Sequence, residues 1–157
     1  MKKTFFYLTL SLCTSLAFSS CNDDDDDAVA PTTEQLLMSD KQWQVTAASA
    51  TILGVPQNIY TTQMQACQRD NIYKFLGNQV LLIDEGATKC DLDDPQQVPA
   101  AWALEGDTIT LDGSMFGLPI SEVDFIIEDI TATKLDLSFT NNSFGPITGT
   151  ATLTVKQ

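Results

Sequence analysis

The stretch Asn71–Asp84, NIYKFLGNQVLLID, decides the fold of this chain. It consists of two runs rich in aliphatic and aromatic residues, separated by the dipeptide Gly77-Asn78. Residues of these types favour strands, and a Gly-Asn dipeptide between two such runs is typical of a tight hairpin turn. We therefore expect two antiparallel strands here, with Leu76 paired opposite Gln79.

Six further runs alternate apolar and polar side chains with a period of two, which is typical of strands with one buried face. They lie around Trp43–Ala47, Val98–Leu104, Ile109–Leu111, Val123–Ile127, Leu135–Phe139 and Ala151–Val155. Short connections, such as Glu105–Asp107, predict that successive strands are antiparallel neighbours. We therefore expect an all-β fold, an eight-stranded antiparallel up-and-down barrel, because closure removes exposed sheet edges. A two-sheet sandwich is the alternative.

A short helix is expected before the first strand. The sequence Thr32-Thr33-Glu34-Gln35 has the pattern of a capping box, and it predicts a helix that runs through Met38. Residues 34–157 supply 124 positions, a length that suits a single domain with one core.

Residues 1–20 have the three parts of a secretory signal peptide: a start with two lysines, an apolar run, and two serines before Cys21. A transmembrane helix is the alternative, but Phe5–Phe18 is only 14 residues long and a bilayer span needs ~20. The residues before Cys21 resemble a bacterial lipobox. We therefore expect an exported lipoprotein whose lipid anchor is attached to Cys21.

Residues 21–33 are expected to form a lipidated acidic tether. Five consecutive carboxylates, Asp23–Asp27, repel one another, and the segment has too few apolar residues to form a packed structure. One interpretation is a solvated spacer that keeps the domain clear of the membrane. The other is a sorting signal, because the acidic run resembles the surface-export signal of lipoproteins from the Bacteroidetes group. The expected location is the outer membrane, at the cell surface.

The composition excludes several classes of function. The formal net charge is −13, and residues 1–20 contain two of the eight basic residues and none of the acidic ones, so the remaining chain carries −15. Such a chain is repelled by nucleic acid. The sequence has no histidine, which excludes Ser-His and Cys-His catalysis and histidine-based zinc sites. We therefore predict no enzyme activity, no catalytic or metal-binding residues and no cofactor.

Cys67 and Cys90 are predicted to form a disulfide, because the exported protein would fold in an oxidising compartment. The hairpin register expected above places Cys67 opposite Thr88, two residues short of Cys90. A redox pair or a metal site is the alternative, but the chain has neither a Cys-x-x-Cys motif nor a histidine.

Several segments resemble the lipocalin-like domain of Bacteroidetes lipoproteins, over roughly residues 36–155. They are Leu36–Trp43 (LLMSDKQW), Cys67–Phe75 (CQRDNIYKF), Asp84–Cys90 (DEGATKC), Ala101–Leu104 (AWAL) and Thr133–Leu137 (TKLDL). The resemblance implies an eight-stranded barrel that binds a small apolar ligand.

Eight apolar residues are candidates for a ligand-binding site. Six aromatic residues lie on the apolar faces of the expected strands, and two more side chains lie in an unusually apolar connection. They are Trp43, Tyr73, Phe75, Trp102, Phe125 and Phe139, followed by Met115 and Phe116. A small barrel is either filled by such side chains or holds one small ligand, with a mouth near Met115–Leu118 or Phe144.

Two functions therefore remain open. The first is a lipid-anchored binding module for a small apolar or amphipathic ligand or for a protein partner. The second is a structural or accessory subunit of an outer-membrane assembly, with a filled barrel and no ligand. A cavity in the interior favours the first, and a filled core with an exposed docking patch favours the second.

Overall fold

The computed structural model describes residues 30–142 and 146–156. The chain divides into two units, Met1–Ala30 and Pro31–Gln157, and nearly all described residues belong to the second. The predicted signal peptide, Cys21 and the acidic run Asp23–Asp27 lie outside the described residues, as does Phe144.

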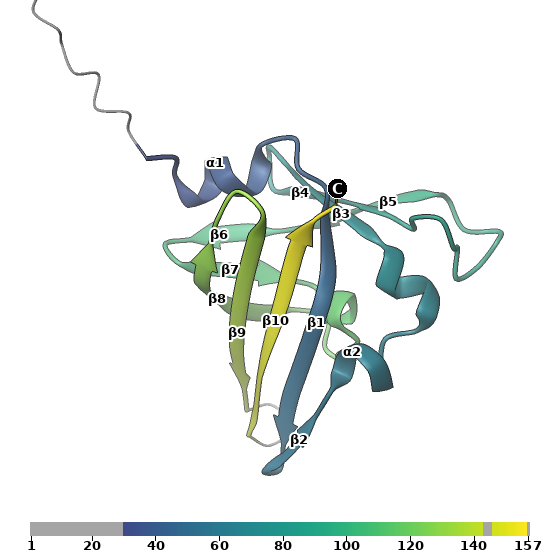
Figure 1. Cartoon of the computed structure of the whole chain (residues 1–157), viewed down its shortest axis with the longest axis vertical. Helices are drawn as coiled ribbons and strands as arrows, with labels where there is room; N and C mark the ends of the chain where they lie inside the picture. The colour runs from purple at the N-terminus through teal and green to yellow at the C-terminus, as the bar shows by residue number, and fades with distance from the viewer. Residues whose placement is uncertain (1–29, 143–145, 157) are drawn as a thin grey trace, which may run out of the picture. The chain divides into compact units, whose positions relative to one another are not determined.

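Within the described residues, ten strands form one sheet in which every pairing is antiparallel (Figure 1). They are β1 (Trp43–Ile52), β2 (Val55–Gln57), β3 (Ile72–Leu76), β4 (Val80–Asp84), β5 (Gln97–Ala101), β6 (Ala103–Glu105), β7 (Thr108–Leu111), β8 (Val123–Ile130), β9 (Lys134–Asn141) and β10 (Ile147–Val155). The strand order is β5-β4-β3-β1-β10-β9-β8-β7-β6, and β2 pairs with β1. The predicted antiparallel β fold is confirmed.

The number of strands and the closure of the sheet into a barrel differ from the prediction. The run Val98–Leu104 forms two strands, because the chain changes partner at Trp102: β5 pairs with β4, and β6 pairs with β7. The short strand β2 was not predicted. The strand order does not close, and its two end strands, β5 and β6, are joined in the chain by Trp102 alone.

Short helices connect or precede the strands. They are α1 (Thr33–Met38), α2 (Ile59–Thr62) and the two 3₁₀ helices η1 (Ala66–Asp70) and η2 (Gly113–Phe116). The predicted capping box of α1 is confirmed, because the Thr32 and Gln35 side chains each accept a hydrogen bond from the other residue's backbone N–H. Leu37 fixes the helix to the sheet, since its side chain is buried and its carbonyl accepts a bond from Trp43 Nε1 at 3.1 Å.

The hairpin between β3 and β4 forms as predicted, but its register differs by one residue. Leu76 pairs with Val80 instead of Gln79. The turn contains three residues, and two of them, Asn78 and Gln79, have positive φ angles of 59° and 61°. The new register places Phe75 opposite Leu81, so that two buried apolar side chains pack against each other across the hairpin.

The predicted disulfide between Cys67 and Cys90 is confirmed. Cys67 lies in η1 and Cys90 lies in the connection between β4 and β5, with a Cα–Cα distance of 5.2 Å. The connection is also held by Asp70, whose Oδ2 accepts bonds from the backbone N–H groups of Ala87 and Thr88 at 3.0 and 2.9 Å.

Candidate functional site

The structure brings the eight predicted site residues together in the interior. All of them are buried, with exposed fractions between 0 and 4 %. They are Trp43, Tyr73, Phe75, Trp102, Met115, Phe116, Phe125 and Phe139. The alternation therefore correctly identified the inward-facing side chains among the five of these residues that lie in strands, Trp43, Tyr73, Phe75, Phe125 and Phe139.

The aromatic rings of this group pack against one another. Phe125 lies between two rings, with centroid distances of 4.9 Å to Phe116 and 5.3 Å to Phe139. Phe75 meets Trp102 edge to face at 5.2 Å. These distances are those of rings in direct contact, so these rings pack against one another in the core.

The apolar connection around η2 turns into the core. Asp112 begins this turn, since its Oδ1 accepts a bond from Ser114 N at 2.8 Å, and Met115, Phe116 and Leu118 are buried. The position expected for a pocket mouth, Met115–Leu118, is therefore occupied by side chains that belong to the core.

Tyr73 ties η2 to the sheet. Its hydroxyl donates a bond to the Met115 carbonyl oxygen at 3.4 Å. Burial raises the pKa of Tyr73 to about 12, and a hydrogen bond with the Asn71 side chain acts in the opposite direction. A phenol that stays protonated well above pH 10 serves here as a structural hydrogen-bond donor.

A cleft of about 600 Å³ lies on the surface beside Trp102, where the chain passes from one end of the sheet to the other. It is lined by Gln79, Pro99, Ala100, Ala101, Trp102, Ala103, Thr110, Leu111, Asp112, Ser121 and Glu122. The cleft thus lies between β5, the end of β7 and the segment before β8. We call it the Trp102 cleft.

The indole of Trp102 is fixed in place at the border of this cleft. Its Nε1 donates to the carbonyl oxygens of Leu76 and Val80, both at 3.1 Å, and its backbone N–H donates to the Gln79 carbonyl at 3.0 Å. The ring is 4 % exposed. Trp102 therefore has one side against the core and borders the cleft with the other.

Carboxylates border the Trp102 cleft, and none of its lining residues is basic. Asp112 is half-buried and Glu122 is exposed. Asp124 follows closely in the chain and accepts a bond from Thr110 Oγ1 at 2.7 Å. Sequence reasoning identified Trp102 but missed the other lining residues, because they come from separate segments and have small or polar side chains.

A second surface is distinguished by the absence of charge. Thr46–Gln68 and Leu137–Val155 contain no Asp, Glu, Lys or Arg, although the whole chain has 29 such residues. The two segments pair with each other through β1 and β10, and β9 pairs with β10 (Figure 1). We call the surface formed by residues 46–68, 137–142 and 146–155 the neutral face. Hydroxyl groups cover it, such as those of Ser49 and Thr150, which lie 2.9 Å apart.

The neutral face carries two shallow grooves. One, of about 150 Å³, has Tyr60 and Asn58 among its lining residues. The other, of about 360 Å³, has Pro56 and Thr140 among its lining residues. At the end of β1, Leu53 is 74 % exposed.

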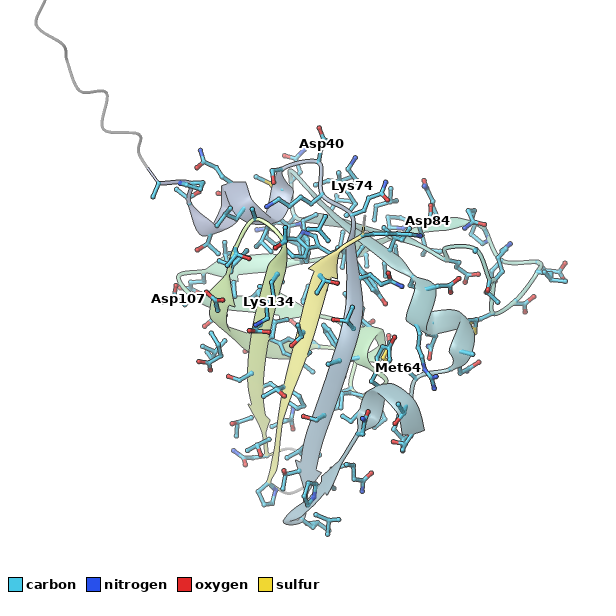
Figure 2. The ribbon with its side chains drawn as sticks, viewed as in Figure 1. Asp40, Met64, Lys74, Asp84, Asp107 and Lys134 are labelled. Atoms are coloured by element: carbon cyan, nitrogen blue, oxygen red, sulfur yellow. A yellow bond between two sulfur atoms is a disulfide. The ribbon has the colours of Figure 1, made fainter. Side chains whose placement is uncertain are left out.

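Some of the charged side chains elsewhere form local contacts. Lys74 of β3 forms a salt bridge with Asp40 at 3.1 Å, and the two labelled side chains lie at the same end of the domain in Figure 2. Lys134 pairs with Asp136 at 2.5 Å. Bonds from the Gln97 and Gln96 amides lower the pKa of Asp84. Over the described ranges 30–142 and 146–156, no group of three or more metal-ligating side chains is present.

In the part of the chain that the structure describes, no helix has the length and apolar character required to cross a bilayer. The chain matches none of the protein-family models, curated proteins or solved structures with which it was compared.

Proposed function

We propose that this protein is an exported, lipid-anchored binding module without enzymatic activity, held by Cys21 at the outer surface of the outer membrane. The signal-like residues 1–20, the small residues before Cys21 and the acidic run Asp23–Asp27 support this location. The resemblance to lipocalin-like lipoproteins supports the same assignment.

A lipocalin-like arrangement of the strands is part of this proposal. Trp102 joins β5 to β6, the two end strands of the sheet, and each of them pairs with a different neighbour. Counted as one bent strand, β5–Trp102–β6 would wrap the sheet around the filled core. The bend would leave the Trp102 cleft at the position where pairing to β4 stops and pairing to β7 starts.

The binding site that the geometry supports best is the Trp102 cleft, and its size and lining carry the proposal. Ligand sites commonly enclose 300 to 1,000 Å³ and combine an apolar lining with a few polar groups. The cleft has about 600 Å³, with Trp102, Leu111 and three alanines beside Asp112 and Thr110. Because the interior aromatics pack against one another, a small apolar or amphipathic ligand would bind at this surface.

The anchor is tested by Cys21→Ser. Without the thiol that accepts the lipid, we expect the variant to leave the membrane fraction or to accumulate as an unprocessed precursor. Fractionation and intact-mass measurement in the native host distinguish these products from the lipidated wild type. Mature-sized Cys21→Ser protein that stays in the membrane fraction would contradict the assignment of the anchor.

Ligand binding is tested with N-phenyl-1-naphthylamine, an uncharged fluorescent probe. We expect saturable binding with quenching of tryptophan emission, because Trp102 borders the cleft whereas Trp43 is fully buried. Trp102→Phe should remove most of the quenching, since Trp43 is then the remaining tryptophan.

A matched pair of variants in β5 locates the probe. Ala101→Phe places a ring in the cleft and should weaken binding at least tenfold. Val98→Phe is the control, because Val98 lies on the same strand, is 40 % exposed and is not among the lining residues. Equal binding by the two variants would place the probe elsewhere, and no saturable binding by the wild type would exclude this function.

An accessory subunit of an outer-membrane assembly is the second candidate, and the neutral face favours it. A chain with so many carboxylates repels other anionic surfaces, and the uncharged face of β1, β10 and residues 137–141 of β9 removes that repulsion locally. A filled core is sufficient for such a role. Loss of a co-purifying membrane partner on Thr150→Asp, with the N-phenyl-1-naphthylamine affinity unchanged, would support this candidate.

A further inference from the structure

We propose that the Trp102 cleft selects cationic amphiphiles, that is, molecules with an amine head group and an apolar tail. The inference rests on the proposed function of this cleft as a ligand site, and it adds the chemical class of the ligand. Three observations support it: the apolar residues in the lining of the cleft, the carboxylates at its border and the absence of a basic residue among its lining.

The apolar part of the lining accounts for the tail of the ligand. Trp102, Leu111 and Pro99 supply a large ring and two aliphatic side chains, and Ala100, Ala101 and Ala103 add small apolar ones. Burying an apolar tail here is favourable by roughly 25 cal/mol for each Å² removed from water. This contribution does not depend on the charge of the head group.

The carboxylates account for the head group. Among the described residues, Asp112 uses only Oδ1 in a hydrogen bond, to Ser114 N at 2.8 Å, and Glu122 forms neither a hydrogen bond nor an ion pair. Their charge is thus not neutralised within the cleft. A cation beside a half-buried carboxylate is attracted more strongly than one in bulk water, because the effective dielectric constant is lower there.

No basic residue in the lining compensates the negative potential of these carboxylates. Those that the structure describes are Lys41, Arg69, Lys74, Lys89, Lys134 and Lys156, and none of them lines the cleft. Two of them, Lys74 and Lys134, already pair with Asp40 and Asp136. An anionic head group would therefore meet two carboxylates without a counter-charge, whereas an ammonium group would also find oxygen acceptors on Thr110 and Ser121.

The test compares three probes with the same tail: octylamine, 1-octanol and octanoate, each displacing N-phenyl-1-naphthylamine at pH 7 and low salt. We expect octylamine to bind at least tenfold more tightly than octanoate, with 1-octanol between them. The preference should shrink in 0.5 M salt, because screening weakens the attraction at the exposed Glu122.

Two double variants with the same change in net charge show whether the preference for octylamine comes from the carboxylates at the cleft or from the net charge of the whole protein. Asp112→Asn/Glu122→Gln should abolish the preference and leave the affinity for 1-octanol within about twofold, since Asn also caps a helix turn. Glu105→Gln/Asp107→Asn should keep the preference, because these residues do not line the cleft. Asp107, labelled in Figure 2, lies in the turn between β6 and β7.

Each outcome has one meaning. Equal affinities for octylamine and octanoate would overturn the proposed selectivity for cations, and so would an equal loss of preference in both double variants. In either case, binding of 1-octanol would still support the cleft as a ligand site. Failure of all three probes to displace N-phenyl-1-naphthylamine would overturn the ligand site itself and the selectivity with it.

Discussion

Phe125→Ala is expected to lower the free energy of unfolding by about 3 to 5 kcal/mol, the range for removing a large buried ring. Phe125 is fully buried, and its ring contacts those of Phe116 and Phe139. The substitution removes both contacts and leaves a cavity that the surrounding strands can fill only in part. Chemical denaturation followed by circular dichroism measures the change.

Ile126→Ala is the matched control for this prediction. Ile126 is the next residue of β8, and its side chain is 44 % exposed, so we expect a loss below about 1 kcal/mol. A similar small loss for Phe125→Ala would show that the interior is loosely packed. It would then favour a ligand cavity among the aromatic rings over the Trp102 cleft.

Local patterns in the sequence were sufficient to predict most of the strands. The alternation of side chains identifies the inward faces, because a buried face requires apolar residues at every second position. The capping box at Thr32 likewise predicts the start of α1, since both of its hydrogen bonds are local. These features depend on residues that are close in the chain.

One feature that was missed, the change of strand partner at Trp102, depends on contacts between distant residues. The alternating run Val98–Leu104 gives no sign that its strand changes partner at Trp102, because that change is set by the positions of β4 and β7. The hairpin register was wrong by one residue for a local reason. Gly77-Asn78 is compatible with a two-residue turn, but Gln79 also adopts a positive φ and lengthens it.

For the candidate site, too, the residues with a local sequence pattern were predicted and those brought together by the fold were not. Trp102 was predicted to lie inside the barrel, either as a side chain that fills it or as a wall of a pocket, and the structure places it in the core where it borders an outer cleft. The alanines and Glu122 that complete this cleft carry no sequence signal, because exposed alanines and carboxylates occur throughout so acidic a chain. The absence of charge over Thr46–Gln68 and Leu137–Val155 was visible in the sequence, but only strand pairing shows that it forms one face.

Removing the disulfide is expected to lower the free energy of unfolding by about 3 kcal/mol, the value that the chain-entropy model gives for a closed loop of this length. Cys67 and Cys90 are separated by 23 positions in the chain. Without the bond the unfolded chain gains conformational freedom, whereas the folded connection keeps its hydrogen bonds to Asp70. Cys67→Ser/Cys90→Ser should therefore fold to the same structure with lower stability.

Guanidinium denaturation of the wild type and of Cys67→Ser/Cys90→Ser, each with and without reductant, tests this expectation. Reductant should destabilise the wild type to the level of the double variant, since Cys90 is exposed and accessible, and should leave the variant unchanged. The double variant should also show a larger dependence of unfolding free energy on denaturant, because its unfolded chain exposes more surface. A double variant as stable as the oxidised wild type would show that the bond does not constrain the unfolded chain, and that hydrogen bonds such as those of Asp70 and Gln96 are sufficient to hold the connection between β4 and β5.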